Sequence, residues 1–208
     1  MENNFIYLDN ASTTPLSENV LNIINSTYRN YWHNPSSTYE LGIKCSTYLE
    51  KIRSKIAYIF EAEPEDIIFT SGSSESTNIV FNNIYENFKN GRVVISNVEH
   101  QATTICANKL KKQNWDIYEW TVTNDGILNI SNIEKILNND TKLVSIIWGQ
   151  SEIGTIQPVQ FIGSKCEELN IMFHLDGTQI LSNGIFSWKD LKCDFLSLSA
   201  HKFGGPKG

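Results

Sequence analysis

The amino-acid sequence predicts an α/β fold with a mostly parallel sheet that carries helices on both faces. Strand-like and helix-like segments alternate along most of the 208 residues. The strand-like segments are continuous apolar runs, which is typical of strands buried on both faces. Short polar clusters follow these runs, as expected where parallel strands end at one edge of a sheet.

The first half of the predicted sheet comes from three short segments. "DIIFT" (66–70) has the pattern of a short buried strand, and the helix predicted after it, over 73–88, has serine at its entry. "RVVISN" (92–97) predicts the second strand, and a helix-like segment follows at 101–113. "WDIYEW" (115–120) predicts the third strand.

The second half repeats the alternation. In "SNIE", Ser131 and Glu134 have the spacing of a capping box, which predicts that a helix opens with "IEKIL". The remaining segments are three predicted strands and one predicted helix: strands 142–149, 171–177 and 193–200, and helix 160–170. We expect residues 16–208 to form one domain and residues 1–15 to form an N-terminal arm.

Composition excludes several classes of protein. The net charge is −6 and the isoelectric point is about 5.2, and no Lys/Arg cluster is present, which argues against nucleic-acid binding. No apolar run is long enough to span a membrane, and the first residues lack the pattern of a signal peptide. Cys45, Cys106, Cys166 and Cys193 are far apart, which argues against a cysteine zinc site and favours reduced thiols in a cytoplasmic protein.

The cluster "TSGSSES" (70–76) has the composition of an anion site. Its small residues let backbone N–H groups approach an anion, and the helix that follows offers its positive end. The hydroxyls of Ser73 and Ser74 are further donors. The segment is not a nucleotide P-loop. A purely structural turn before a helix is the alternative.

Three other strand ends carry residues with possible chemistry. Asp176 ends an apolar run and fits a partner for a protonated ring nitrogen, or else a helix cap or structural ion pair. Lys202, next to His201, fits an amine that forms a Schiff base, or else a surface lysine in a glycine-rich turn. His100 fits a ring-stacking proton carrier or a helix cap, and His174 fits a hydrogen-bonded core residue.

Seven segments together resemble the cysteine desulfurases, which are fold-type I pyridoxal-phosphate enzymes of the class V aminotransferase group. The resemblance covers nearly the whole chain. The segments are "YLDNASTTP" (7–15), "NPSSTYELG" (34–42), "IIFTSGSSESTN" (67–78), "VEHQA" (98–102), "SEIGTIQP" (151–158), "FHLDGTQ" (173–179) and "SLSAHKFGGPKG" (197–208).

The resemblance implies roles around the ring of pyridoxal 5'-phosphate. Lys202 would bind the cofactor aldehyde covalently and, with His100, act as a catalytic residue. Asp176 would pair with the ring nitrogen, and Gln179 would bind the phenolic oxygen. Ser151 stands where the family usually has an asparagine that reaches this oxygen, and a serine hydroxyl reaches less far. His100 would stack on the ring.

The resemblance also implies a phosphate site and a substrate contact. Ser73 and Ser74 would hold the cofactor phosphate at the helix N-terminus, together with Ser199 and His201. Ser74 replaces the threonine that is typical of this loop. Asn34 would help to bind the substrate carboxylate.

The activity implied by the resemblance is conversion of L-cysteine to L-alanine, with the sulfur passed to an enzyme persulfide. Family members continue beyond "GPKG" with another strand, the nucleophilic cysteine and the small domain. We therefore expect a chain truncated after Lys202, in which residues 1–15 belong to the small domain and 16–208 are part of the cofactor-binding large domain. None of the four cysteines is expected to be the nucleophile.

The implied partners are a second identical subunit and a sulfur acceptor, such as an iron–sulfur scaffold or a tRNA-thiolation enzyme. Three alternatives remain from the sequence. One is a selenocysteine lyase or another class V enzyme. The second is a non-catalytic remnant that binds the cofactor without turnover. The third, a nucleotide-binding module, is weak because no nucleotide fingerprint is present.

Overall fold

A computed structural model of the chain describes residues 6–184 and 186–207. Its centre is a five-stranded sheet in which every pairing is parallel and the strand order is β2-β1-β3-β4-β5. The strands are β1 (Arg92–Ser96), β2 (Asp116–Trp120), β3 (Thr141–Ile147), β4 (Met172–Asp176) and β5 (Phe195–Ser197). The predicted fold class is confirmed.

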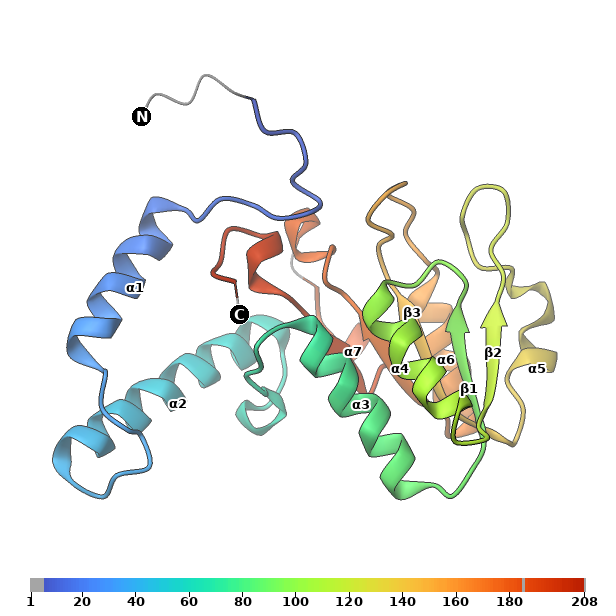
Figure 1. The fold of residues 1–208 in the computed structure, drawn as a ribbon, viewed down its shortest axis with the longest axis horizontal. Coiled ribbons are helices and arrows are strands. Elements are labelled where there is room, and N and C mark those ends of the chain that lie inside the picture. The colour runs from blue at the N-terminus through green and yellow to red at the C-terminus, as the bar shows by residue number, and fades with distance from the viewer. Residues whose placement is uncertain (1–5, 185, 208) are drawn as a thin grey trace.

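Helices cover both faces of this sheet (Figure 1). The α-helices in the described ranges are α1 (Glu18–Asn30), α2 (Glu40–Phe60), α3 (Ser73–Asn87), α4 (Gln101–Lys111), α5 (Ile133–Ile136), α6 (Val159–Leu169) and α7 (Trp188–Leu191), of which α3 to α7 pack on the sheet. The neighbouring residues Val93 and Val94 of β1 pack into different core clusters, the first with α3 and α4 and the second with α5, α6 and α7. The continuous apolar runs of β1, β3 and β4 therefore have a direct cause, since these central strands are buried on both faces. No helix in the described ranges combines the length and apolarity that a membrane crossing needs.

The helices α1 and α2 extend away from the sheet (Figure 1). α1 has no buried residue, and α2 buries only Gly42, Cys45 and Ala57. Large apolar side chains on and between these helices stay exposed, including Tyr28, Trp32 and Tyr58. This part of the chain therefore adds little to the core around the sheet.

The prediction of a strand at 66–70 is wrong. Residues Pro64–Asp66 form a short 3-10 helix, and 67–70 are not part of the sheet. The carbonyl of Ile67 accepts a hydrogen bond from the guanidinium of Arg53, and Ile68 is 70% exposed. A strand requires a neighbouring strand to complete its hydrogen bonds, which a local apolar pattern cannot reveal.

The predicted capping box is also wrong. The side chain of Asn129 accepts a hydrogen bond from the backbone N–H of Ser131 at 3.2 Å, so that Ser131 lies inside a 3-10 turn. α5 then begins at Ile133, after Asn132, without a side-chain cap. Asn129 therefore caps the 3-10 turn, and the Ser131 hydroxyl donates to the same Asn129 oxygen, because Asn favours such local bonds.

A line of buried polar side chains crosses three strands. His174 of β4 bonds Ser145 of β3 through Nδ1 and Ser197 of β5 through Nε2, each at 2.8 Å. All three residues are buried, and burial lowers the pKa of His174 to about 4. The prediction that His174 is a hydrogen-bonded core residue is confirmed.

Replacing this histidine is expected to destabilise the sheet. His174→Leu leaves the hydroxyls of Ser145 and Ser197 buried without their partner, and we expect a loss of about 2–4 kcal/mol in the free energy of unfolding. Urea denaturation followed by circular dichroism measures it. Adding Ser145→Ala to His174→Leu removes one stranded hydroxyl and should recover part of the loss. A further loss in the double variant would contradict this account.

Candidate active site

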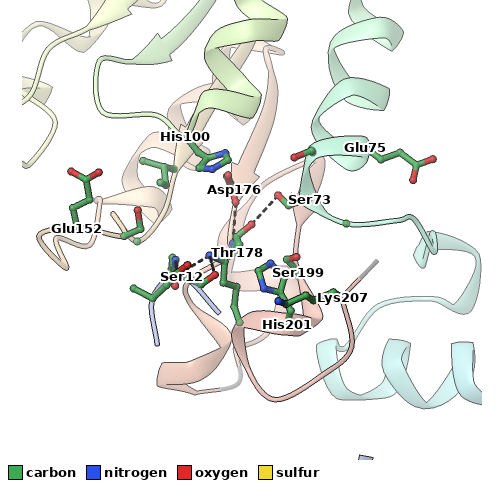
Figure 2. Close-up of a pocket in the computed structure, with 18 of the residues that line it drawn as sticks. Ser12, Ser73, Glu75, His100, Glu152, Asp176, Thr178, Ser199, His201 and Lys207 are labelled. Carbon is green, nitrogen blue, oxygen red and sulfur yellow. Dashed lines mark hydrogen bonds between the residues drawn. The ribbon is translucent and has the colours of Figure 1, made fainter. Parts of the chain in front are cut away.

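Residues at or just after the carboxyl ends of β1, β3, β4 and β5 line a cavity of about 650 Å³ (Figure 2). The nine residues predicted to contact the cofactor all line it: Ser73, Ser74, His100, Ser151, Asp176, Gln179, Ser199, His201 and Lys202. Asn34 is not among the lining residues; it lies in an exposed turn, where its side chain accepts a hydrogen bond from the N–H of Ser36 at 2.8 Å. Its proposed substrate contact remains a prediction.

One end of the cavity is the N-terminus of α3. Gly72 precedes this helix with φ of 142°, a conformation that favours glycine, and no side-chain hydrogen bond caps the helix among the described residues. The hydroxyl of Ser73 accepts a hydrogen bond from Thr178 at 2.8 Å. Uncapped N–H groups, hydroxyls and the positive end of a 15-residue helix together suit an anion.

Glu75 lies in the same first turn but takes part in a different contact. Its carboxylate accepts a hydrogen bond from the N–H of Ser71 at 2.6 Å, and this bond lowers the pKa of Glu75. Figure 2 shows the carboxylate directed away from Ser73 and Asp176. The negative charge of Glu75 is thus turned away from the anion end of the cavity.

The centre of the cavity holds an acid and an amine. Asp176 is 3% exposed at the end of β4, and its Oδ1 accepts the N–H of Thr178 at 3.0 Å. Lys202 donates from Nζ to the carbonyls of Ala11 at 2.7 Å and Ser12 at 2.9 Å. Burial lowers the pKa of Lys202, while the negative charges of Asp176 and Asp9 oppose this shift. A partly desolvated lysine is the kind that forms a Schiff base.

The N-terminal arm forms part of the cavity wall next to Lys202. The sequence analysis did not predict this role for the arm. Asp9, Ala11 and Ser12 line the cavity, and Gln179 donates to the carbonyl of Ala11 at 2.8 Å. Contacts across more than 160 residues have no local signal in a sequence. The sequence signal that could have indicated this contact is the stretch of small and polar residues "DNASTT" (9–14), which directly follows an apolar stretch.

His100 lies where the helix α4 begins. It is the N-cap residue, and its Nδ1 accepts the N–H of Ala102 at 3.2 Å. The ring also lines the cavity (Figure 2), so the cap and a ligand contact coexist. Because an accepting Nδ1 carries no proton in the neutral ring, the proton of the neutral ring is on Nε2.

Ser151 belongs to a loop that Gln150 holds in place. The side-chain oxygen of Gln150 accepts the N–H groups of Glu152 at 2.6 Å and Ile153 at 2.9 Å. Ser151, between them, lines the cavity with its short hydroxyl side chain.

Glu99 is a second residue that sequence reasoning missed. Its Oε1 accepts the hydroxyl of Ser96 at 2.5 Å and the N–H of Ile147 at 2.7 Å, so that it joins the ends of β1 and β3. Its Oε2 is buried without a hydrogen-bond partner among the described residues. Burial raises the pKa of Glu99 to about 8, and the charge of Asp176 adds to the shift.

The residues present fit pyridoxal 5'-phosphate. An anion site at α3, a buried carboxylate at Asp176 and an amine at Lys202 correspond to the phosphate, the basic ring nitrogen and the aldehyde of that molecule. Hydrogen-bonding side chains for the phenolic oxygen, Gln179 and Ser151, also line the cavity.

The four cysteines lie elsewhere. All four are buried, and none is among the lining residues of the cavity. Burial raises the pKa of Cys166 and of Cys193 to about 12 and also raises the pKa of Cys106. Thiols of this kind are poor nucleophiles, because the thiolate is the reactive form.

Comparison with known proteins places this geometry in a family. Residues 6–208 match the family model described as Aminotransferase class-V. A curated relative, the cysteine desulfurase IscS of Clostridium botulinum, is 35% identical over 208 residues, which is 99% of this chain and 52% of the relative. A second, from Dictyoglomus turgidum, is 36% identical over 98% of this chain and 52% of its own length. The chain thus spans about half the length of these relatives.

Solved structures give the same result. A NifS-like protein superposes with a TM-score of 0.93 at 32% identity and covers 98% of this chain and 57% of its own. A structure described as SspA in complex with cysteine superposes with a TM-score of 0.92 at 29% identity, over 98% of this chain and 59% of its own.

Glu99 makes stability depend on pH in a defined direction. Its pKa is about 8 in the folded chain and 4.5 as the reference for the unfolded one, so the folded state binds the extra proton. Stability should therefore fall as pH rises from about 4.5 to 8, by a few kcal/mol at about 1.4 kcal/mol per pKa unit.

The matched variants are Glu99→Gln and Glu152→Gln, since Glu152 is an exposed acid that lines the cavity, whereas the carboxyl group of Glu99 is buried. Denaturation between pH 5 and pH 9, at about unit steps, should show that Glu99→Gln removes most of this slope, because glutamine does not ionise. Glu152→Gln should keep it. An unchanged slope in Glu99→Gln would contradict the assignment.

Proposed function

The chain belongs to the Aminotransferase class-V family, and from this premise we propose that it is part of a cysteine desulfurase that uses pyridoxal 5'-phosphate. The substrate would be L-cysteine, the product L-alanine, and the sulfur would pass to an enzyme persulfide. Curated relatives at 34–36% identity carry the name cysteine desulfurase, and a structural neighbour is described as a complex with cysteine.

One observation carries the proposal most strongly. Asp176 and Lys202 line the same cavity, together with the open N-terminus of α3. A carboxylate that is 3% exposed requires a cation or several donors to offset its desolvation, yet Thr178 supplies the one hydrogen bond to Oδ1 found among the described residues. A protonated ring nitrogen would meet this need.

Each residue then has a defined task. Pyridoxal 5'-phosphate, when bound, supplies an aldehyde for amines and a ring that draws electrons from the substrate α-carbon. Asp176 holds a proton on the ring nitrogen. Lys202, whose Nζ donates to the carbonyls of Ala11 and Ser12 in this structure, would hold the cofactor through its aldehyde and would move a proton at the substrate α-carbon. His100, through Nε2, assists that proton transfer.

The phosphate, the phenolic oxygen and the substrate carboxylate each have their own contacts. Ser73, Ser74, Ser199 and His201 hold the phosphate at the N-terminus of α3, where the helix dipole favours negative charge. Gln179 and Ser151 bind the phenolic oxygen. Asn34 contributes to the substrate carboxylate site in the assembled protein.

We propose the remaining steps for the whole protein. The nucleophile that takes the sulfur is a cysteine other than the four buried ones. Two copies of the protein form a homodimer in the cytoplasm, and the persulfide passes to a sulfur-acceptor protein of iron–sulfur cluster assembly or tRNA thiolation. Exposed aromatic side chains on and between α1 and α2, Tyr28, Trp32 and Tyr58, support an interface on that face of the protein.

Borohydride reduction tests the position of the cofactor amine. Protein treated with pyridoxal 5'-phosphate and then borohydride should carry one stable label, which peptide mass spectrometry places on Lys202. Lys202→Ala should abolish the label. Lys207→Ala is the matched control, since Lys207 lines the same cavity and should leave labelling of Lys202 intact. A label that moves to Lys207 or stays after Lys202→Ala would overturn the proposal.

Asp176→Asn tests the ring-nitrogen contact. Alanine release from L-cysteine by the full-length protein should fall by about 100-fold or more, the usual cost of removing a preorganised electrostatic group. Asp9→Asn removes another acid of the same cavity and should cost far less. Equal losses in the two variants would show that general charge, and not the contact of Asp176, is responsible.

A further inference from the structure

The N-terminal arm makes an unusually dense set of contacts with one turn near the other end of the described chain. The N–H and the hydroxyl of Thr14 both donate to the carbonyl of His201, each at 2.9 Å. The N–H of Gly204 donates to the hydroxyl of Thr14 at 2.7 Å. The arm therefore fixes the backbone of the turn that carries His201 and Lys202.

Thr13 makes a contact of a different kind, with the His201 ring. Its hydroxyl lies 3.0 Å from Nδ1 of His201 and 3.5 Å from the carbonyl of the same residue. A hydroxyl has one proton to donate. The carbonyl already accepts two shorter bonds from Thr14, so the proton of Thr13 is better used at Nδ1.

The donation from Thr13 to Nδ1 determines the tautomer of His201 as long as the ring is neutral. Burial lowers the pKa of His201, and the positive charges of Lys202 and Lys207 lower it further. A neutral imidazole has a single N–H, and the hydrogen bond at one nitrogen determines where that N–H is. When Nδ1 accepts from Thr13, the proton is on Nε2.

His201 lines the cavity beside Ser199, as Figure 2 shows. We propose that Thr13 is a positioning residue that fixes the neutral His201 with its proton on Nε2, so that this N–H donates to an anion bound at the N-terminus of α3. The inference rests on the proposed function in one respect, because the anion it names is the phosphate of pyridoxal 5'-phosphate.

The first test reads the tautomer without any ligand. Nitrogen-15 NMR of the histidine side chains, in the full protein free of cofactor, should show His201 as the Nε2–H tautomer, assigned by its loss in His201→Gln. Thr13→Ser keeps a hydroxyl and should preserve the tautomer. In Thr13→Val, valine has nearly the shape of threonine but no hydroxyl, so His201 should become a mixture of the Nε2–H and Nδ1–H tautomers. An Nδ1–H tautomer in the unmodified protein overturns the proposal.

The second test measures the affinity of the protein for phosphate-containing ligands. Thr13→Val should weaken binding of pyridoxal 5'-phosphate and of inorganic phosphate about tenfold, the usual effect of one hydrogen bond to a charged group, whereas Thr13→Ser should not. Binding of pyridoxal, which has no phosphate, should be unchanged in all variants. In a His201→Gln background, Thr13→Val should have no further effect. An equal loss for pyridoxal overturns the proposal, since it indicates a merely structural role.

The two tests separate this inference from the proposed function. If the tautomer and phosphate results are as expected but no label forms on Lys202, the proposed function fails and the role of Thr13 stands. If the label forms but Thr13→Val changes neither tautomer nor phosphate affinity, the role of Thr13 fails alone.

Discussion

The buried carboxylate of Asp176 is the constraint on which the site depends. It ends β4 and is 3% exposed. A carboxylate in such a place is costly unless positive charge or donors face it. Among the described groups, one backbone N–H bonds its Oδ1, and the charge of Lys202 interacts with it. The end of β4 thus places a buried negative group where a cationic group of a ligand is favoured.

The same constraint accounts for Glu99. Burial raises the pKa of the Glu99 carboxyl to about 8, and the negative charge of Asp176 adds to this shift. Glu99 is then mostly protonated at neutral pH, and its Oε1 still accepts the hydrogen bonds that join the ends of β1 and β3.

The sequence predicted the part of the molecule that local patterns determine. Buried parallel strands and the helices between them have clear periodicity, so that β1 to β5 were found within a few residues. The nine cavity residues could be placed because parallel strands end at one edge, and the family resemblance gave their roles. The strand at 66–70 was predicted wrongly, because its existence depends on a partner strand. The arm was missed as a cavity wall, because the contacts of Ala11 and Thr13 join opposite ends of the chain.

The most direct test of the central claim is the protonation state of the cofactor's ring nitrogen. Pyridoxal 5'-phosphate labelled with nitrogen-15 in the ring, bound to the full-length protein at neutral pH, reports it by NMR. We expect a protonated nitrogen in the unmodified protein and an unprotonated one in Asp176→Asn. An unprotonated nitrogen in the unmodified protein, or a protonated one that persists in Asp176→Asn, would contradict it.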